Sequence, residues 1–156
     1  MRVWPRYLLG ALALGAGLQL VPYGRHHENP PVVREPEWDR PRTRELFFRV
    51  CRDCHSHETR WPWYSSVAPA SWLVEYDVEE ARSHFDVSDW GRAHNHGDEA
   101  AELLRTGRMP PWRYRVAHPD ARLFEREREE LVAGLVATFG DSESESAHSQ
   151  PHDHHD

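Results

Sequence analysis

The chain has 156 residues, a length that favours one globular domain with additional segments. Hydrophobic residues make up 38% of it and charged residues 29%, which is enough for one modest core and excludes a protein with several membrane spans. The formal net charge is −7 and no basic face is apparent, so nucleic acid is not expected as a partner. Two cysteines are too few for a disulfide framework.

The N-terminus has the pattern of an export segment. Arg2 and Arg6 precede an apolar run over residues 7–21, and such a basic lead directs a chain into the export pathway. The run is short for a full membrane span and long for a signal peptide, and no small-residue cleavage site follows it. We therefore expect an uncleaved membrane anchor over residues 1–24, with the rest of the chain on the periplasmic side. A cleaved signal peptide and a buried core helix are the alternatives.

A proline-rich linker over residues 25–42 is expected to run extended between this anchor and a folded domain at residues 43–140. Within the domain, apolar residues recur at helical spacing and strand signals are nearly absent, so the fold class expected is all-α. The expected helices cover residues 44–51, 71–85, 98–106 and 124–139, with a short turn at 88–90.

The C-terminal tail over residues 141–156 is acidic and rich in serine and histidine, and we expect it to be disordered. Its four histidines are candidates for weak binding of a divalent metal ion such as Zn²⁺, Ni²⁺ or Cu²⁺. They are His148, His152, His154 and His155. The simpler interpretation is a solvated tail without a function.

Residues 51–55, Cys-Arg-Asp-Cys-His, form the C-x-x-C-H signature of c-type haem attachment. Cys51 and Cys54, three residues apart at a helix end, lie on one face and can both reach the vinyl groups of one haem. His55 is then placed to bind the iron from the proximal side. Between the cysteines, Arg52 and Asp53 are expected to face solvent.

The cysteine pair has three other possible interpretations. A redox dithiol would need a βαβ context, which the sequence lacks. A zinc site could recruit His55 or His57, but a second cysteine pair at ligand spacing is missing. A disulfide between positions three residues apart would be strained. The export segment favours the haem interpretation, because c-type haem is attached outside the cytoplasmic membrane.

Met109 is the candidate for the second axial ligand of the iron. It is followed by Pro110 and Pro111, which hold the chain in a stiff extended loop that could present the sulfur. A methionine that fills a gap in the core is the alternative. Four histidines of the domain compete for the same role, although each is expected at the surface. They are His84, His94, His96 and His118.

The sequence resembles the bacterial haem-binding domain family of small membrane-anchored c-type cytochromes. The resemblance is carried by the C-x-x-C-H and the aromatic string after it up to Ser65, by residues 67–74, by the Gly-x-Met-Pro-Pro-Trp of residues 107–112 and by residues 118–123. It spans most of residues 45–137. One departure is Phe124, which stands where a capping serine is usual, so that Asp120 is a candidate for the cap instead.

The resemblance implies a cytochrome c-like helical domain around one covalent haem c and its iron, with Cys51 and Cys54 as thioether sites and His55 as proximal ligand. Similarity to class I cytochromes c implies Met109 as the distal ligand. The tryptophans of the aromatic string could wall off the haem, or they could be ordinary core residues. They are Trp61, Trp63, Trp72 and Trp112.

The function expected from these features is one-electron transfer to or from a redox partner protein that the sequence does not identify, and not enzymatic catalysis. A peroxidase would need an open distal site with an acid–base group, and a two-haem peroxidase would need a second C-x-x-C-H. A haem-based sensor or ligand-binding protein with an exchangeable sixth site is the alternative.

Overall fold

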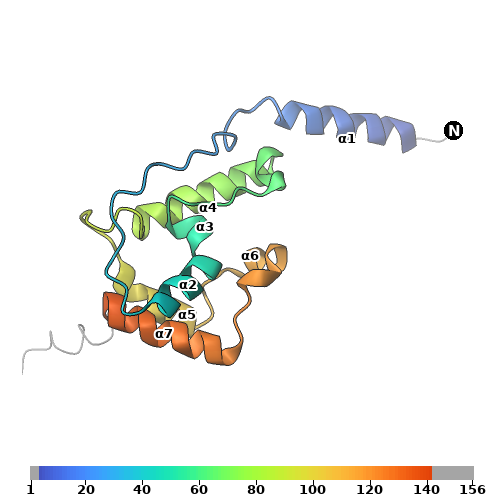
Figure 1. Cartoon of the computed structure of the whole chain (residues 1–156). Coiled ribbons are helices and arrows are strands. Elements are labelled where there is room, and N and C mark those ends of the chain that lie inside the picture. Colours follow the sequence, from blue (N-terminus) through green and yellow to red (C-terminus); the bar gives the residue numbers. More distant parts are fainter. Residues whose placement is uncertain (1–3, 142–156) are drawn as a thin grey trace, which may run out of the picture.

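The computed structural model describes residues 4–141. Within that range the regular secondary structure is helical, apart from one isolated bridge between Arg34 and Asp89 (Figure 1). The expected all-α fold class is therefore confirmed. The α-helices are α1 (Trp4–Leu18), α2 (Pro41–Val50), α3 (Arg52–His55), α4 (Ala70–His84), α5 (Ala100–Arg105), α6 (Trp112–Ala117) and α7 (Glu125–Phe139). Three short 3₁₀ helices accompany them, η1 (Trp63–Ser66), η2 (Gly97–Glu99) and η3 (Pro119–Ala121).

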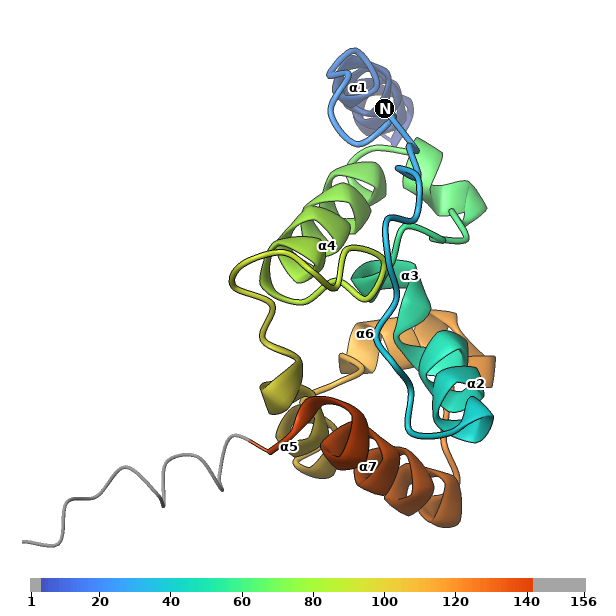
Figure 2. The same cartoon turned by 60° about the vertical axis from the view of Figure 1, so that its left-hand side comes forward.

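The core forms where α2 and α5 pack on α7 (Figures 1 and 2). Leu46 and Phe47 of α2 meet Leu131 and Leu135 of α7, and all four are at most 2% exposed. The two α7 residues lie one helical turn apart, which is the spacing that predicts a buried face from sequence. The C-x-x-C-H therefore begins at the end of a helix that the core holds rigidly.

A glycine permits the close approach of α2 to α7. A Cβ atom at Gly134 would lie 2.1 Å from Oγ1 of Thr43, far inside van der Waals contact. Thr43 is itself only 1% exposed, so its side chain has little room to move away. The absence of a side chain at position 134 thus sets the spacing of these two helices.

Aromatic rings join the segment after α4 to this core. Phe85 packs edge-on against Phe47 and Phe139, with ring centroids 5.8 and 5.3 Å apart. Trp90 lies 4.7 Å from Phe139 in the same cluster. Because edge-to-face pairs restrain ring orientation, the backbone at Phe85 is held firmly in place. This backbone is part of the site described below.

The four expected helices are present as α2, α4, α5 and α7. Their ends lie within two residues of the expected ones, except that α2 begins three residues earlier, at Pro41. The start of α7 differs in its cap. Phe124 precedes the helix, and its backbone N–H donates to Oε2 of Glu127 at 3.1 Å. Asp120, the candidate cap, lies in η3 instead. A glutamate reaching back thus stabilises the helix start in place of a serine side chain.

The segment expected as an extended linker over residues 25–42 is free of helix up to Arg40, whereas residues 41 and 42 already belong to α2. It is also bound to the domain along its length. His27 stacks on Trp61 and its Nε2 lies 2.9 Å from the Ser65 carbonyl oxygen. Asn29 donates to the Thr59 carbonyl at 2.9 Å, and Trp38 packs against the core. This segment is therefore part of the folded unit as well as a connection.

The N-terminal helix α1 has 15 residues, and four of its five leucines are exposed. Among the helices of residues 4–141, none combines the length and the apolar character needed to cross a membrane. The spanning helix expected over residues 1–24 is thus not confirmed, because the helix ends at Leu18. The histidines of the tail lie outside the described residues.

Candidate functional site

Residues 51–55 fold as one tight turn, in which Cys51 ends α2 and the next four residues form α3. The amide of Cys51 donates to the Phe47 carbonyl at 2.8 Å and so completes the last turn of α2. The amides of Cys54 and His55 donate back to the Cys51 carbonyl at 3.2 and 3.0 Å. Both cysteines are free thiols. The structure thus brings together the three motif residues predicted from sequence.

The imidazole of His55 is held in one tautomer by the main chain. Its Nδ1 lies 2.9 Å from the carbonyl oxygen of Phe85, and because a carbonyl only accepts, the ring must donate from Nδ1. Burial lowers the pKa of His55, against the opposing effect of this hydrogen bond, so the ring is neutral at pH 7. A neutral imidazole protonated at Nδ1 presents the lone pair of Nε2, which is the form that ligates a metal.

The two thiols are kept in their protonated form. Desolvation by the surrounding protein raises the pKa of Cys51 to about 12, and the neighbouring Cys54 adds to the effect. Desolvation and the charges of Asp77 and Asp53 raise the pKa of Cys54 to about 12 as well. A redox dithiol needs the opposite, a lowered pKa that yields a thiolate. The environment therefore disfavours the redox interpretation of this pair.

The zinc interpretation finds no ligand cluster in the part of the chain that the structure describes. Within residues 4–141, no three or more His, Cys, Asp or Glu side chains are arranged to hold a metal ion. His57, a candidate ligand in that interpretation, is bound elsewhere. Its Nε2 lies 2.8 Å from Oδ2 of Asp86 and its Nδ1 lies 2.8 Å from the Pro31 carbonyl oxygen.

The segment over residues 85–88, which follows α4, holds the backbone on either side of the histidine side chain. The amide of Val87 donates to the His55 carbonyl at 3.0 Å, and the amide of His57 donates to Oγ of Ser88 at 2.9 Å. With the bond from His55 to Phe85, these contacts join the turn to the end of α4 at three points. His55 is thus oriented by residues thirty positions away in the chain.

Asp53 differs from expectation, since its side chain is buried and does not face solvent. It is 6% exposed and accepts hydrogen bonds from the backbone and side chain of Arg60 and from the hydroxyl of Tyr114. Burial opposes its ionisation, but the bonds from Arg60 and Tyr114 outweigh burial and lower the pKa of the Asp53 carboxyl. The residue between the cysteines is therefore an ionised anchor for α6.

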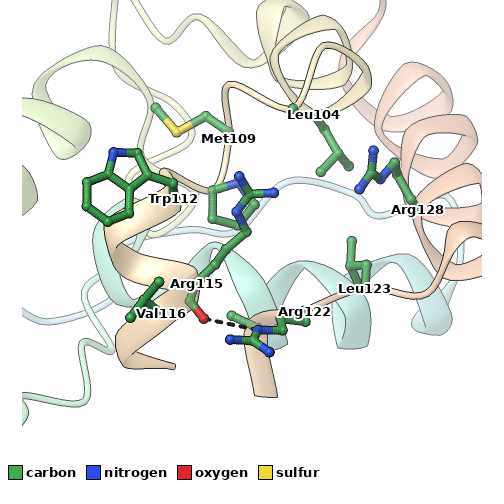
Figure 3. A pocket seen from close by; sticks show the side chains of 11 residues that line it. Leu104, Met109, Trp112, Arg115, Val116, Arg122, Leu123 and Arg128 are labelled. Carbon is green, nitrogen blue, oxygen red and sulfur yellow. Dashed lines mark hydrogen bonds between the residues drawn. The ribbon is translucent and has the colours of Figure 1, made fainter. Parts of the chain in front are cut away.

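Met109 lies in the loop between α5 and α6, after Gly107, whose φ of 70° ends α5 as the sequence predicts. The methionine side chain lines a cavity of about 290 Å³ together with Trp112, Leu104 and Arg115 (Figure 3). Cys51, Cys54 and His55 do not line this cavity. The structure thus places Met109 on a loop next to a cavity without joining it to the motif turn.

The four rival histidines differ in their surroundings. His84, His94 and His96 are exposed, as expected. His118 is half-buried: it stacks on Tyr114 at 4.1 Å, its Nδ1 lies 3.2 Å from the Tyr114 carbonyl oxygen and its Nε2 lies 3.4 Å from the hydroxyl of Tyr64. Its ring is therefore restrained by protein groups on both nitrogens.

None of the four tryptophans expected around the haem belongs to the buried core. Trp63 and Trp112 are 81% and 70% exposed, which is unusual for such large apolar side chains. Trp61 and Trp72 are half-buried, and each has a buried indole N–H without a hydrogen-bond acceptor among the described residues. Buried donors without acceptors are costly, so these two N–H groups would gain from a ligand that offers a hydrogen-bond acceptor.

Several residues of the site escape prediction from sequence. Phe85 acts through its backbone carbonyl, which no side-chain pattern reveals, and Asp86 and Tyr114 act through partners far away in the chain. The one signal in the sequence is that Phe85 and Val87 are apolar and two positions apart, which predicts that the segment after α4 is buried. Its pairing with His55 becomes visible only in three dimensions.

The chain matches the model of a known family, described as the haem-binding domain, over residues 13–137. No curated protein and no solved structure is similar enough to count as a match. The matched range contains the C-x-x-C-H turn, the Met109 loop and the extended segment bound to the domain. Two free thiols beside a neutral imidazole, and indole donors without acceptors, are groups that suit a haem with its two propionates. The chain belongs to the haem-binding domain family.

Proposed function

We propose that this haem-binding domain is a c-type cytochrome that transfers single electrons. The thiols of Cys51 and Cys54 would each add S–H across a vinyl group to form a thioether, and Nε2 of His55 would ligate the iron. A bound haem supplies a one-electron redox couple. The observation that carries the proposal is the bond from His55 Nδ1 to the Phe85 carbonyl, because it leaves Nε2 as the ligating atom beside two protonated thiols.

The protein residues would control the polarity around the iron. Cys51, Cys54 and His55 are half-buried, and burial raises the pKa of both thiols and lowers the pKa of His55, so the turn lies in a medium less polar than water. Such a medium disfavours the extra positive charge of the ferric state and raises the potential. The unpaired indole N–H groups of Trp61 and Trp72 would donate to the propionates.

The role of His55 can be tested by removing its ring. We expect His55→Gly to lose the low-spin absorption spectrum and to regain it when imidazole is added to the protein. His84→Gly is the matched control, because His84 is exposed, and it should keep the spectrum without imidazole. A His55→Gly protein with the spectrum of the unaltered protein would contradict the proposal.

For the sixth position we propose the sulfur of Met109. The loop that carries it is tied to α5, since the Met109 amide donates to the Leu103 carbonyl at 3.0 Å. A thioether is a soft, neutral ligand that suits an electron-transfer site.

A second candidate function is that of a haem-based sensor with an exchangeable sixth site. It is favoured by the position of Met109 at a cavity that no motif residue lines. Carbon monoxide separates the two functions, because it binds rapidly and completely to reduced haem only where the sixth site is open.

We also propose that the domain works outside the cytoplasmic membrane, with residues 1–24 directing export and holding the protein at the membrane. Arg2 and Arg6 near the start of the sequence, and the four exposed leucines of α1, support this placement. Cell fractionation with N-terminal sequencing tests it. A soluble mature protein that begins near Arg25 would contradict retention at the membrane and indicate a cleaved signal.

A further inference from the structure

We infer that Asn95 is a positioning residue that sets the strength of the hydrogen bond from His55 to Phe85. Asn95 lies in the loop between α4 and η2, forty residues after the histidine, and acts through a single peptide group. The inference rests on the proposed role of His55 as iron ligand.

The peptide group between Phe85 and Asp86 has a hydrogen bond on each side. Its carbonyl oxygen, on Phe85, accepts from Nδ1 of His55 at 2.9 Å. Its N–H, on Asp86, donates to Oδ1 of Asn95 at 3.1 Å. One rigid plane therefore connects the imidazole of His55 with the side-chain amide of Asn95.

Asn95 makes two contacts with the backbone of Asp86, one to this peptide group and one to the next along the chain, and together they fix the orientation of its amide. Besides accepting from the Asp86 N–H, it donates from Nδ2 to the Asp86 carbonyl at 2.9 Å. Asp86 is 2% exposed, so water is not available to replace either contact. The side chain of Asp86 adds a third restraint, since its Oδ1 accepts from the Ser88 amide at 2.8 Å.

The loop that carries Asn95 is bound closely to α4 on both sides of the asparagine. Nη2 of Arg92 donates to the Ser83 carbonyl at 2.9 Å, and the amide of His96 donates to the His84 carbonyl at 3.0 Å. His94 has a φ of 64°, in the left-handed region that residues other than glycine rarely adopt. A backbone conformation this unfavourable persists only where surrounding contacts impose it.

Loss of Asn95 would weaken the bond to His55 in two ways. Hydrogen bonds in a chain polarise one another, so an N–H that donates makes the carbonyl of the same peptide a stronger acceptor. Without its acceptor, the buried Asp86 N–H would also be driven to find another partner, which rotates the Phe85 carbonyl away from the ring. A weaker bond leaves His55 less basic, which stabilises ferric iron less and raises the potential.

The test compares Asn95→Ala with Asn29→Ala in the full-length, haem-loaded protein. Asn29 is the other asparagine of the chain and also donates to a main-chain carbonyl, that of Thr59, but it has no contact with the Phe85–Asp86 peptide. The readouts are the midpoint potential and the exchange rate of the His55 ring N–H in the reduced, diamagnetic protein by NMR. We expect Asn95→Ala to raise the potential and to accelerate exchange about tenfold, and Asn29→Ala to change neither.

Two further variants secure the comparison. Asn95→Asp retains an acceptor for the Asp86 N–H but loses the donor to the Asp86 carbonyl, so its exchange rate should lie between those of the unaltered protein and Asn95→Ala. Asn95→Ser, whose shorter side chain cannot reach both backbone groups, replaces the alanine variant if that one does not accumulate.

The outcomes separate this inference from the proposed function. An unaltered protein without covalent haem would overturn the proposed function, and the inference with it. A haem-loaded Asn95→Ala protein with unchanged potential and exchange would overturn the inference alone, as would an Asn29→Ala protein with an equal shift in both.

Discussion

The hydroxyl of Tyr114 donates a hydrogen bond of 2.8 Å to Oδ2 of Asp53. Tyr114 lies on α6, five residues after Met109, and Asp53 lies between the two cysteines. The bond therefore links the loop of the proposed distal ligand to the turn of the proposed attachment site. A second contact, between Arg113 and Asp77 at 2.7 Å, joins α6 to α4 beside it.

Tyr114→Phe should lower the stability of the domain and loosen the Met109 loop. The buried Asp53 carboxylate would lose one partner, which costs about 1–2 kcal/mol in the free energy of unfolding. The ferric methionine–iron absorption band should weaken in parallel. Tyr76→Phe is the matched control, because Tyr76 is 56% exposed. Equal stability and equal band intensity in Tyr114→Phe, Tyr76→Phe and the unaltered protein would show that the bond from Tyr114 to Asp53 stabilises neither the domain nor the Met109 loop.

Stability should fall in acid through Glu127. Hydrogen bonds from Arg49, and then from the Phe124 amide, lower the pKa of Glu127 to about 2 from its ordinary 4.5. Because the folded-state pKa is the lower one, the carboxylate stabilises the fold above pH 4.5, and this contribution is lost as the pH falls from 4.5 to 2.

Urea unfolding at a series of pH values measures this effect. Glu127→Gln should be less stable than the unaltered protein at pH 6, and its stability should fall less steeply between pH 4.5 and 2. Glu129→Gln, an exposed change on the same helix, should follow the unaltered protein. Parallel curves for Glu127→Gln and the unaltered protein would rule out the proposed contribution.

Gly134→Ala should destabilise the contact of α2 with α7. The new methyl group would overlap Thr43, which the core holds in place, and such overpacking costs about 1–3 kcal/mol. Gly91→Ala is the control, since its Cβ would meet only the flexible end of Arg34, at 3.4 Å. Thermal unfolding compares the two, and equal midpoints would contradict the role given to Gly134.

Local patterns in the sequence predict the longer helices well, because apolar spacing and terminating residues lie within the helix itself or next to it. Apolar spacing locates α7, and Gly107 with the two prolines ends α5. The short α6 cannot be predicted in this way, since six residues give too little periodicity. Within the site, the motif residues could be predicted from sequence, whereas the burial of Asp53 could not. Its partners Arg60 and Tyr114 are seven and sixty-one residues away, and no local pattern predicts such contacts.

Met109→Ala should open the sixth position of the iron. The potential should fall, because the thioether favours the ferrous state, and the reduced protein should begin to bind carbon monoxide. Leu123→Ala is the control, since Leu123 lines the same cavity but carries no ligating atom. An unchanged spectrum and potential in Met109→Ala would assign the site to a histidine or leave it open.

Extraction of the haem with acidified organic solvent, followed by a pyridine spectrum of the protein residue, tests covalent attachment through Cys51 and Cys54 most directly. The unaltered protein should retain its haem after extraction and show the pyridine spectrum of a haem with two thioether bonds. The Cys51→Ala, Cys54→Ala double variant should release all haem to the solvent. Complete extraction of haem from the unaltered protein would contradict the assignment of this domain as a c-type cytochrome.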